Sequence, residues 1–246
     1  MLGLDSTELL LLVCAALLIG FSKSGITGAS LPAVAMIAYS FDGKTASGIM
    51  LTMLIAADIP AIIKYGRYIR FAEMVRLLPP AIIGIVIGAL AGRSLNDAHF
   101  KLLMGIIVLG CLVLIIYGQV FKKPLKAPDS KVFHYATGII SGFSSMVGNA
   151  AGPVFNVYLL SMSLDKYRFL GTTAWFFFTI NLIKVPFHVF MWKTITLSSL
   201  QYALVMLPVI LAGAFIGIYL VKKIDDKYFK AIVAIMTAIA AVNLML

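Results

Sequence analysis

The chain has 246 residues, of which 61% are hydrophobic and 12% charged, and its mean hydropathy is +1.02. Soluble proteins contain roughly half hydrophobic and about a quarter charged residues, so the composition excludes a soluble domain and indicates an all-α polytopic membrane protein. The formal net charge of +10 is explained by Lys and Arg beside apolar runs, and nucleic acid is not an expected partner.

The first apolar run is expected to stay in the membrane. Residues 1–8 contain Asp5 and Glu8 but no basic residue. A signal peptide would begin with a positively charged stretch. The run from Leu9 to Ile19 is therefore predicted to be a retained helix rather than a cleaved leader.

A stretch with three glycines and a proline, at 20–32, interrupts the first apolar region. Glycine and proline disfavour a continuous helix, and backbone groups freed inside a membrane must be buried in protein or line a cavity. A helix that restarts there offers free N–H groups and a positive dipole end to an anion. The stretch therefore predicts an anion-binding element that includes Lys23, Gly25 and Gly28.

A second copy of this stretch lies about 120 residues later, at 142–153. Both copies open with Gly-Phe-Ser and close with proline, but the second carries no charge. Its most conspicuous polar group is the amide of Asn149, which both donates and accepts hydrogen bonds. The residues of this copy predicted to bind the anion are Ser144, Gly148 and Asn149.

The apolar pattern predicts about ten helical segments. A full span needs about 20 apolar residues, so the short pair at each break is either a re-entrant hairpin or two tilted spans. The predicted segments are 8–20, 27–40, 44–64, 72–92 and 98–118, then 132–145, 150–163, 167–191, 196–221 and 227–246. A basic, aqueous linker at 119–131 separates the two sets.

The two halves, 1–118 and 132–246, match each other beyond the breaks. Two pairs, Pro60/Pro186 and Asp58/Lys184, share an offset of 126. Six further pairs share an offset of 129: Pro79/Pro208, Gly88/Gly217, Asn96/Asp225, Asp97/Asp226, Phe100/Phe229 and Lys101/Lys230. Self-similarity at a fixed spacing indicates an internal duplication within a single membrane domain, 1–246.

The basic residues predict the orientation of the two halves. If the loops near 64–76 and 122–131 are cytoplasmic, that side collects fourteen Lys and Arg residues and the outer side keeps four. Cytoplasmic loops carry such an excess. The first half then begins outside and the second inside, so the halves are predicted to be inverted repeats. Inverted halves with interrupted segments are typical of secondary transporters with a binding site near the bilayer midplane.

Both breaks resemble the paired motifs of the TauE/SafE sulfite exporter family, also called TSUP, and the resemblance covers the whole chain. It implies a multi-pass protein of the bacterial cytoplasmic (inner) membrane that transports small sulfur-containing anions such as sulfite, sulfonates or sulfoacetate. The second motif has Asn149-Ala150-Ala151 where glycines are common, so the substrate stays open. The residues that carry the resemblance are Gly20-Phe21-Ser22-Lys23-Ser24-Gly25 with Gly28, and Ser141-Gly142-Phe143 with Gly148-Asn149-Ala150-Ala151-Gly152-Pro153.

Ionisable residues within apolar segments are candidates for function, because each costs at least about 2.5–3.5 kcal/mol to insert. Lys23 is the first of these. Asp58 and Lys184 lie at repeat-equivalent positions beside prolines, where either a buried ion pair or a coupling role fits them. His188 lies one turn beyond Lys184 and could transfer protons, although its place near Trp192 favours an interfacial residue.

Asn181 precedes Lys184 by three residues on the same helical face, where its amide can bind sulfonate oxygens. The sequence contains no zincin motif, nucleophile elbow or Walker A motif. It therefore predicts a secondary carrier, not an enzyme, with no metal or cofactor. Its expected partners are a small anion, membrane lipid and protons or Na⁺ as coupling ion. An anion channel, a carrier for a non-sulfur organic anion, and a homodimer are open alternatives.

Overall fold

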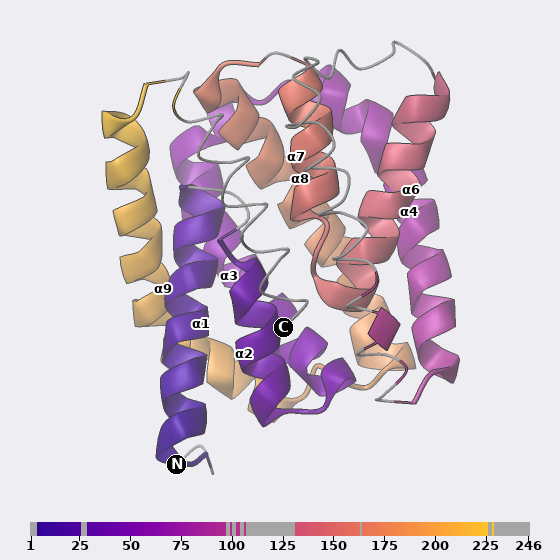
Figure 1. Cartoon of the computed structure of the whole chain (residues 1–246), viewed down its shortest axis with the longest axis vertical. Helices are drawn as coiled ribbons and strands as arrows, with labels where there is room; N and C mark the ends of the chain where they lie inside the picture. Colours follow the sequence, from indigo (N-terminus) through magenta and orange to yellow (C-terminus); the bar gives the residue numbers. More distant parts are fainter. Residues whose placement is uncertain are drawn as a thin grey trace.

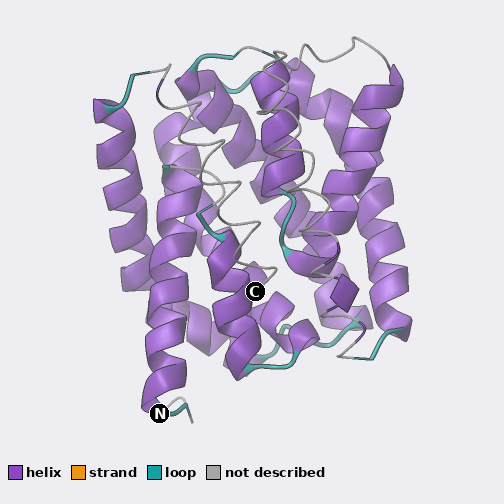
Figure 2. Ribbon diagram, viewed as in Figure 1, coloured by secondary structure: helices purple, strands orange, loops and turns teal. Residues whose placement is uncertain are grey.

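The computed structural model describes residues 4–25, 29–96, 131–162 and 164–225, with single positions at 99, 102, 103, 106 and 228. Within these residues every regular element is a helix (Figure 2). The predicted segments at 98–118 and 227–246 lie almost wholly outside the described residues. So does the 119–131 linker, apart from its last residue.

The described helices follow the predicted segments closely, with ends that differ by a few residues. The first half contains α1 (Ser6–Ser24), α2 (Leu31–Ser40), α3 (Gly43–Tyr65), the 3₁₀ turn η1 (Gly66–Tyr68) and α4 (Phe71–Ser94). The second half contains α6 (Lys131–Gly148), α7 (Gly152–Ser161), α8 (Lys166–Pro186), the π-helical turn η2 (Phe187–Met191) and α9 (Leu197–Lys223).

Among the described residues, five helical stretches are long and apolar enough to cross a membrane. They are Ser6–Ser24, Gly43–Tyr68, Phe71–Ser94, Lys166–Met191 and Leu197–Lys223. Large apolar side chains on their outer faces are exposed, for example Ile63, Leu204 and Phe215. An apolar outer surface is what contact with lipid tails requires.

Helix α1 passes through Gly20, where the sequence predicted the break to begin, and ends at Ser24. The glycine is there for packing: a Cβ at Gly20 would collide with the backbone carbonyl oxygen of Ile210 in α9. Gly142 of α6 lies equally close to the carbonyl oxygen of Ala81 in α4. Glycine permits such close approach of two backbones. Gly20 and Gly142 therefore pack neighbouring helices against each other, and each break begins after them.

The most extensive helix contacts are α4 with α6 and α1 with α9, while α3 contacts both α8 and α9. Each break joins a helix pair, α1–α2 or α6–α7, and the two pairs lead to opposite ends of the molecule (Figure 1). The chain leaves α2 at the end where Phe41 and Lys193 line one surface pocket. It leaves α7 at the other end, where Tyr167 and Lys222 line another.

Candidate anion-binding site

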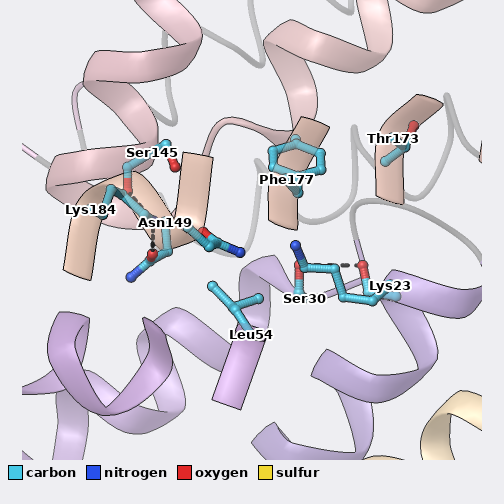
Figure 3. A pocket seen from close by; sticks show the side chains of 11 residues that line it. Lys23, Ser30, Leu54, Ser145, Asn149, Thr173, Phe177 and Lys184 are labelled. Carbon is cyan, nitrogen blue, oxygen red and sulfur yellow. Dashed lines mark hydrogen bonds between the residues drawn. The ribbon is translucent and has the colours of Figure 1, made fainter. Parts of the chain in front are cut away.

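A cavity of about 40 Å³ lies between the two breaks (Figure 3). One buried water needs about 10–15 Å³ measured this way, so the cavity has room for a few waters or a small anion. Leu54, near the middle of α3, and Phe177, near the middle of α8, place it well inside the bundle. The lining residues are Ser22, Lys23, Ser30, Leu54, Ser145, Asn149, Gly152, Thr173, Phe177, Asn181 and Lys184.

Lys23, in the last turn of α1, forms a buried ion pair with Asp58 of α3. Its Nζ lies 2.8 Å from Oδ1 of Asp58 and 4.4 Å from the centre of the Phe177 ring. The amide of Asn181 donates to Oδ2 of Asp58 at 2.7 Å. A cation in the last helical turn also meets the negative end of the helix dipole. The Asp58 carboxylate is therefore neutralised and hydrogen-bonded within the protein.

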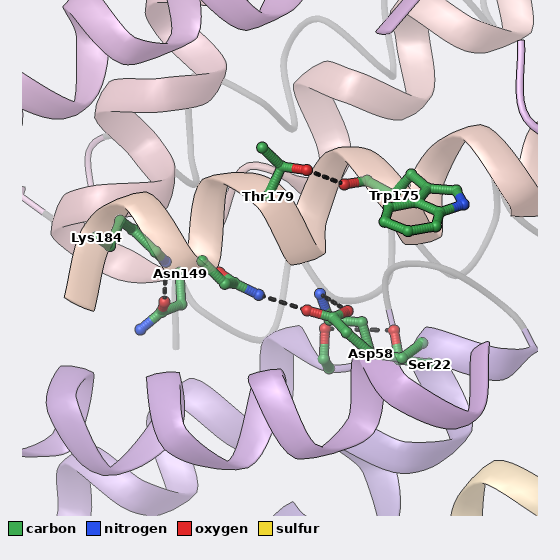
Figure 4. A network of polar contacts seen from close by, with 9 residues as sticks. Ser22, Asp58, Asn149, Trp175, Thr179 and Lys184 are labelled. Atoms are coloured by element: carbon green, nitrogen blue, oxygen red, sulfur yellow. Dashed lines mark hydrogen bonds and ion pairs between the residues drawn. The ribbon is translucent and has the colours of Figure 1, made fainter. Parts of the chain in front are cut away.

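Asn149 ends α6 and orients Lys184. Its backbone has φ 52°, a left-handed conformation that asparagine tolerates better than most residues. Its amide nitrogen donates to the backbone and hydroxyl oxygens of Ser47, both at 3.1 Å. This leaves Oδ1 to accept from Nζ of Lys184 at 2.6 Å (Figure 4). Lys184 donates a second hydrogen bond, to the carbonyl oxygen of Ser145 at 3.0 Å.

Lys184 has no carboxylate partner among the described residues. Its side chain is fully buried, and both of its hydrogen-bond acceptors are neutral oxygens. Ion pairs within the described residues include Lys23–Asp58, Arg76–Glu73 and Arg168–Asp165. With Lys184 protonated, two lysines and one aspartate give the site a formal charge of +1.

Two helices begin at the cavity. Helix α2 starts beside Ser30 and helix α7 starts at Gly152, and both residues line the cavity. Neither helix start receives a hydrogen bond from a side-chain cap. The first backbone N–H groups of a helix have no partner within the helix and favour an anion. The predicted link between a restarted helix and an anion site thus has a geometric basis at both breaks.

Lys23, Asn149, Asn181 and Lys184 line one cavity. Asp58 does not line it but forms an ion pair with Lys23. The sequence suggested a direct ion pair between Asp58 and Lys184. In the structure, the Asp58 carboxylate pairs with Lys23 instead. Those of the remaining predicted residues that the structure describes do not line the cavity. Gly25 packs against α9, Ser144 and Gly148 are buried in α6, and Gly28 lies outside the described residues.

His188, whose place near Trp192 suggested an interfacial residue, lies inside the protein. It is fully buried, its Nδ1 lies 2.8 Å from the hydroxyl oxygen of Thr194, and its ring packs against Trp192 at 4.9 Å. The π-helical turn η2, which directly follows α8, carries it.

Seven lining residues were not among the predicted site residues: Ser22, Ser30, Leu54, Ser145, Gly152, Thr173 and Phe177. The last two could have been found, because they share one face of α8 with Asn181 and Lys184. Positions 173, 177, 181 and 184 follow the three- and four-residue spacing of a helical stripe. The ring of Phe177 also contacts Lys23.

The family model described as sulfite exporter TauE/SafE matches residues 12–244, nearly the whole chain. The chain belongs to this family. Membership confirms the resemblance of the paired motifs and makes the chain a multi-pass membrane protein of a transporter family for sulfur anions such as sulfite. Comparison with curated proteins found no match, and neither did comparison with solved structures.

Proposed function

We propose that this TauE/SafE chain is a secondary transporter that binds a small sulfur oxyanion in the cavity between the two breaks, with Lys184 as its main counterion. The observation that carries the proposal is the buried Lys184, which has no carboxylate partner among the residues that the structure describes. A buried charge is normally paired. An anion in the adjoining cavity would complete the pair.

The comparison of the two halves supports this role for Lys184. Asp58 and Lys184 are 126 residues apart and equivalent in the repeat, and Lys23 and Ser145 occupy equivalent places in the two motifs. In the first half a lysine at the break meets an aspartate on the long helix. In the second half a serine at the break meets a lysine on the long helix. Within its described residues, the second half therefore keeps the cation and lacks the internal anion.

The size and charge of the site favour a compact monoanion. A cavity of about 40 Å³ suits an anion of a few heavy atoms, and a formal charge of +1 is balanced by one negative charge. Bisulfite and methanesulfonate meet both conditions. Sulfoacetate, with two negative charges and a longer skeleton, fits less well, and a bulky organic anion does not fit.

We further propose that the two halves are inverted repeats. Gly20 and Gly142 open the two motifs, and their contacts Ile210 and Ala81 are 129 residues apart. Gly213 and Gly84, also separated by 129, contact Leu17 and Ile139 in the same reciprocal way. Such exchange of equivalent contacts is expected when one half is turned over against the other. Ten segments, a cytoplasmic 119–131 linker and a bacterial inner-membrane location complete this proposal.

Alternating access gives these contacts a role in transport. Helix α1 packs on α9 and α6 packs on α4. Each helix pair that contains a break, α1–α2 or α6–α7, is therefore attached to a long helix of the opposite half. Movement of one such unit against the other would open the cavity first to one side and then to the other. This motion distinguishes a carrier from an anion channel, which needs a continuous path.

The proposal is tested with purified protein and a panel of bisulfite, methanesulfonate, sulfoacetate, sulfate and acetate. A bound ligand raises the melting temperature, and at a given concentration a ligand that binds the folded state more tightly raises it more. We expect the two small sulfur monoanions to stabilise the protein most. In proteoliposomes they should exchange across the membrane by saturable counterflow. Unitary currents without counterflow would instead indicate a channel.

A further inference from the structure

We propose that Lys184 takes up a proton as the anion binds, so that the transporter moves one monoanion together with one proton. The inference rests on the proposed function of the cavity. It concerns the partner ion, which the anion site alone does not specify.

The contacts of Lys184 match those of a neutral amine. A neutral amine has two N–H donors and one lone pair, whereas an ammonium has three donors. Lys184 makes two hydrogen bonds, to the Asn149 side chain at 2.6 Å and to the Ser145 carbonyl at 3.0 Å. Both acceptors are uncharged. With the cavity empty, the two donors are satisfied and no buried charge is left without a counterion.

An anion in the cavity changes this balance. A proton from water adds to the lone pair of Nζ, and the third N–H bond donates to an oxygen of the anion. The ammonium and the monoanion then neutralise each other, while the charges of Lys23 and Asp58 remain paired. Buried opposite charges are favourable when they are paired and hydrogen-bonded. Release of the anion on the other side returns the proton to water there.

The ionisable groups around Lys184 come from three elements. Helix α1 contributes Lys23 and helix α3 contributes Asp58, which neutralise each other. Helix α8 contributes Lys184 itself, and His188 follows one turn later, with Nδ1 held by Thr194. The residues of α6 and α7 that line the cavity, Ser145, Asn149 and Gly152, are uncharged. Among the described cavity residues, Lys184 is therefore the ionisable side chain without an internal counterion.

Proton uptake is measured by calorimetry of methanesulfonate and bisulfite binding in buffers with different ionisation enthalpies. The matched variant is Lys184→Arg, because arginine keeps its charge and has no neutral form under these conditions. The wild type should take up one more proton per bound anion than the variant. Subtracting the two values removes any proton that the anion itself exchanges. Equal proton uptake by both proteins would overturn the proposal.

A second measurement needs no variant and covers the case in which Lys184→Arg does not fold. Proteoliposomes with wild-type protein are given either a pH gradient at zero membrane potential or a potential at equal pH. We expect methanesulfonate, or bisulfite at a pH where the monoanion dominates, to accumulate with the pH gradient and to ignore the potential. Accumulation that follows the potential alone would exclude coupled proton movement. Absence of binding by the wild type would instead reject the anion site itself.

Discussion

Nζ of Lys184 lies 2.6 Å from Oδ1 of Asn149, and Asn149 in turn donates to Ser47 in the first half of the chain. The residue at 149 thus sets what faces the buried amine. An uncharged amide holds Lys184 in place without neutralising it. An anionic ligand in the cavity can therefore form the ion pair with Lys184.

The variant Asn149→Asp should remove anion binding while the protein stays folded. A carboxylate in place of the amide oxygen would supply the missing counterion at ion-pair distance from Lys184. We expect methanesulfonate and bisulfite to bind at least about tenfold more weakly, a change of about 1.4 kcal/mol or more. Calorimetry and ligand-induced melting shifts measure this.

The control for that variant is Asn149→Gly, which keeps the left-handed backbone conformation and deletes the amide without adding charge. It should retain more anion affinity than Asn149→Asp. Equal losses in both variants would mean that the amide, and not the charge balance, decides binding.

A double-mutant cycle tests the Lys23–Asp58 pair. Asp58→Asn leaves a buried lysine without its counterion and should lower the free energy of unfolding by about 3–5 kcal/mol. Lys23→Met with Asp58→Asn should recover most of this loss, because both charges leave together. Denaturant unfolding in detergent provides the four values. Strictly additive losses would show that the two side chains do not interact.

Glycine substitutions test the reciprocal helix contacts. Gly20→Ala and Gly142→Ala each place a methyl group against a backbone carbonyl of the neighbouring helix. Overpacking of this kind typically costs about 1–3 kcal/mol, and we expect similar losses of stability at both positions. Gly152→Ala is the matched control, since a Cβ there meets nothing within 4 Å. A destabilised control with unaffected Gly20→Ala would contradict the packing that the structure describes.

Labelling of single cysteines tests the orientation. Arg67 and Lys222 line a pocket at one end of the molecule and Lys193 lines one at the other. We expect Lys193→Cys to react with an impermeant reagent from outside intact cells, and Arg67→Cys to react only after the membrane is opened. The reverse pattern would invert the proposed topology.

Much of the fold was predictable because hydrophobicity and chain breakers act locally. The predicted segments at 44–64 and 72–92 correspond to α3 (Gly43–Tyr65) and α4 (Phe71–Ser94). Glycine was harder to interpret: Gly20 looked like a helix breaker and is instead a packing residue against α9. Sequence alone does not separate these two uses of glycine, because the deciding contact lies almost 200 residues away.

The charged and amide side chains of the site could be predicted from the sequence, and the ion pairs and hydrogen bonds among them less so. Lys23, Asp58, Asn149 and Lys184 stood out because polar groups in apolar segments are costly. Which lysine forms the ion pair with Asp58 depends on the distance between α1 and α3. This distance is a property of the assembled bundle. The sequence therefore favoured Lys23 as the anion's partner, whereas the geometry favours Lys184.

The central claim is that Lys184 pairs with the transported anion, and binding of bisulfite and methanesulfonate to Lys184→Met tests it most directly. Removing one partner of a buried charge contact typically costs about 2–5 kcal/mol, which corresponds to tens- to thousands-fold in affinity. The control is Lys44→Met, because Lys44 donates to the carbonyl oxygen of Leu95 and lies outside the cavity. The account predicts that Lys184→Met folds and loses binding while Lys44→Met binds as the wild type does. Unchanged affinity in Lys184→Met would contradict it.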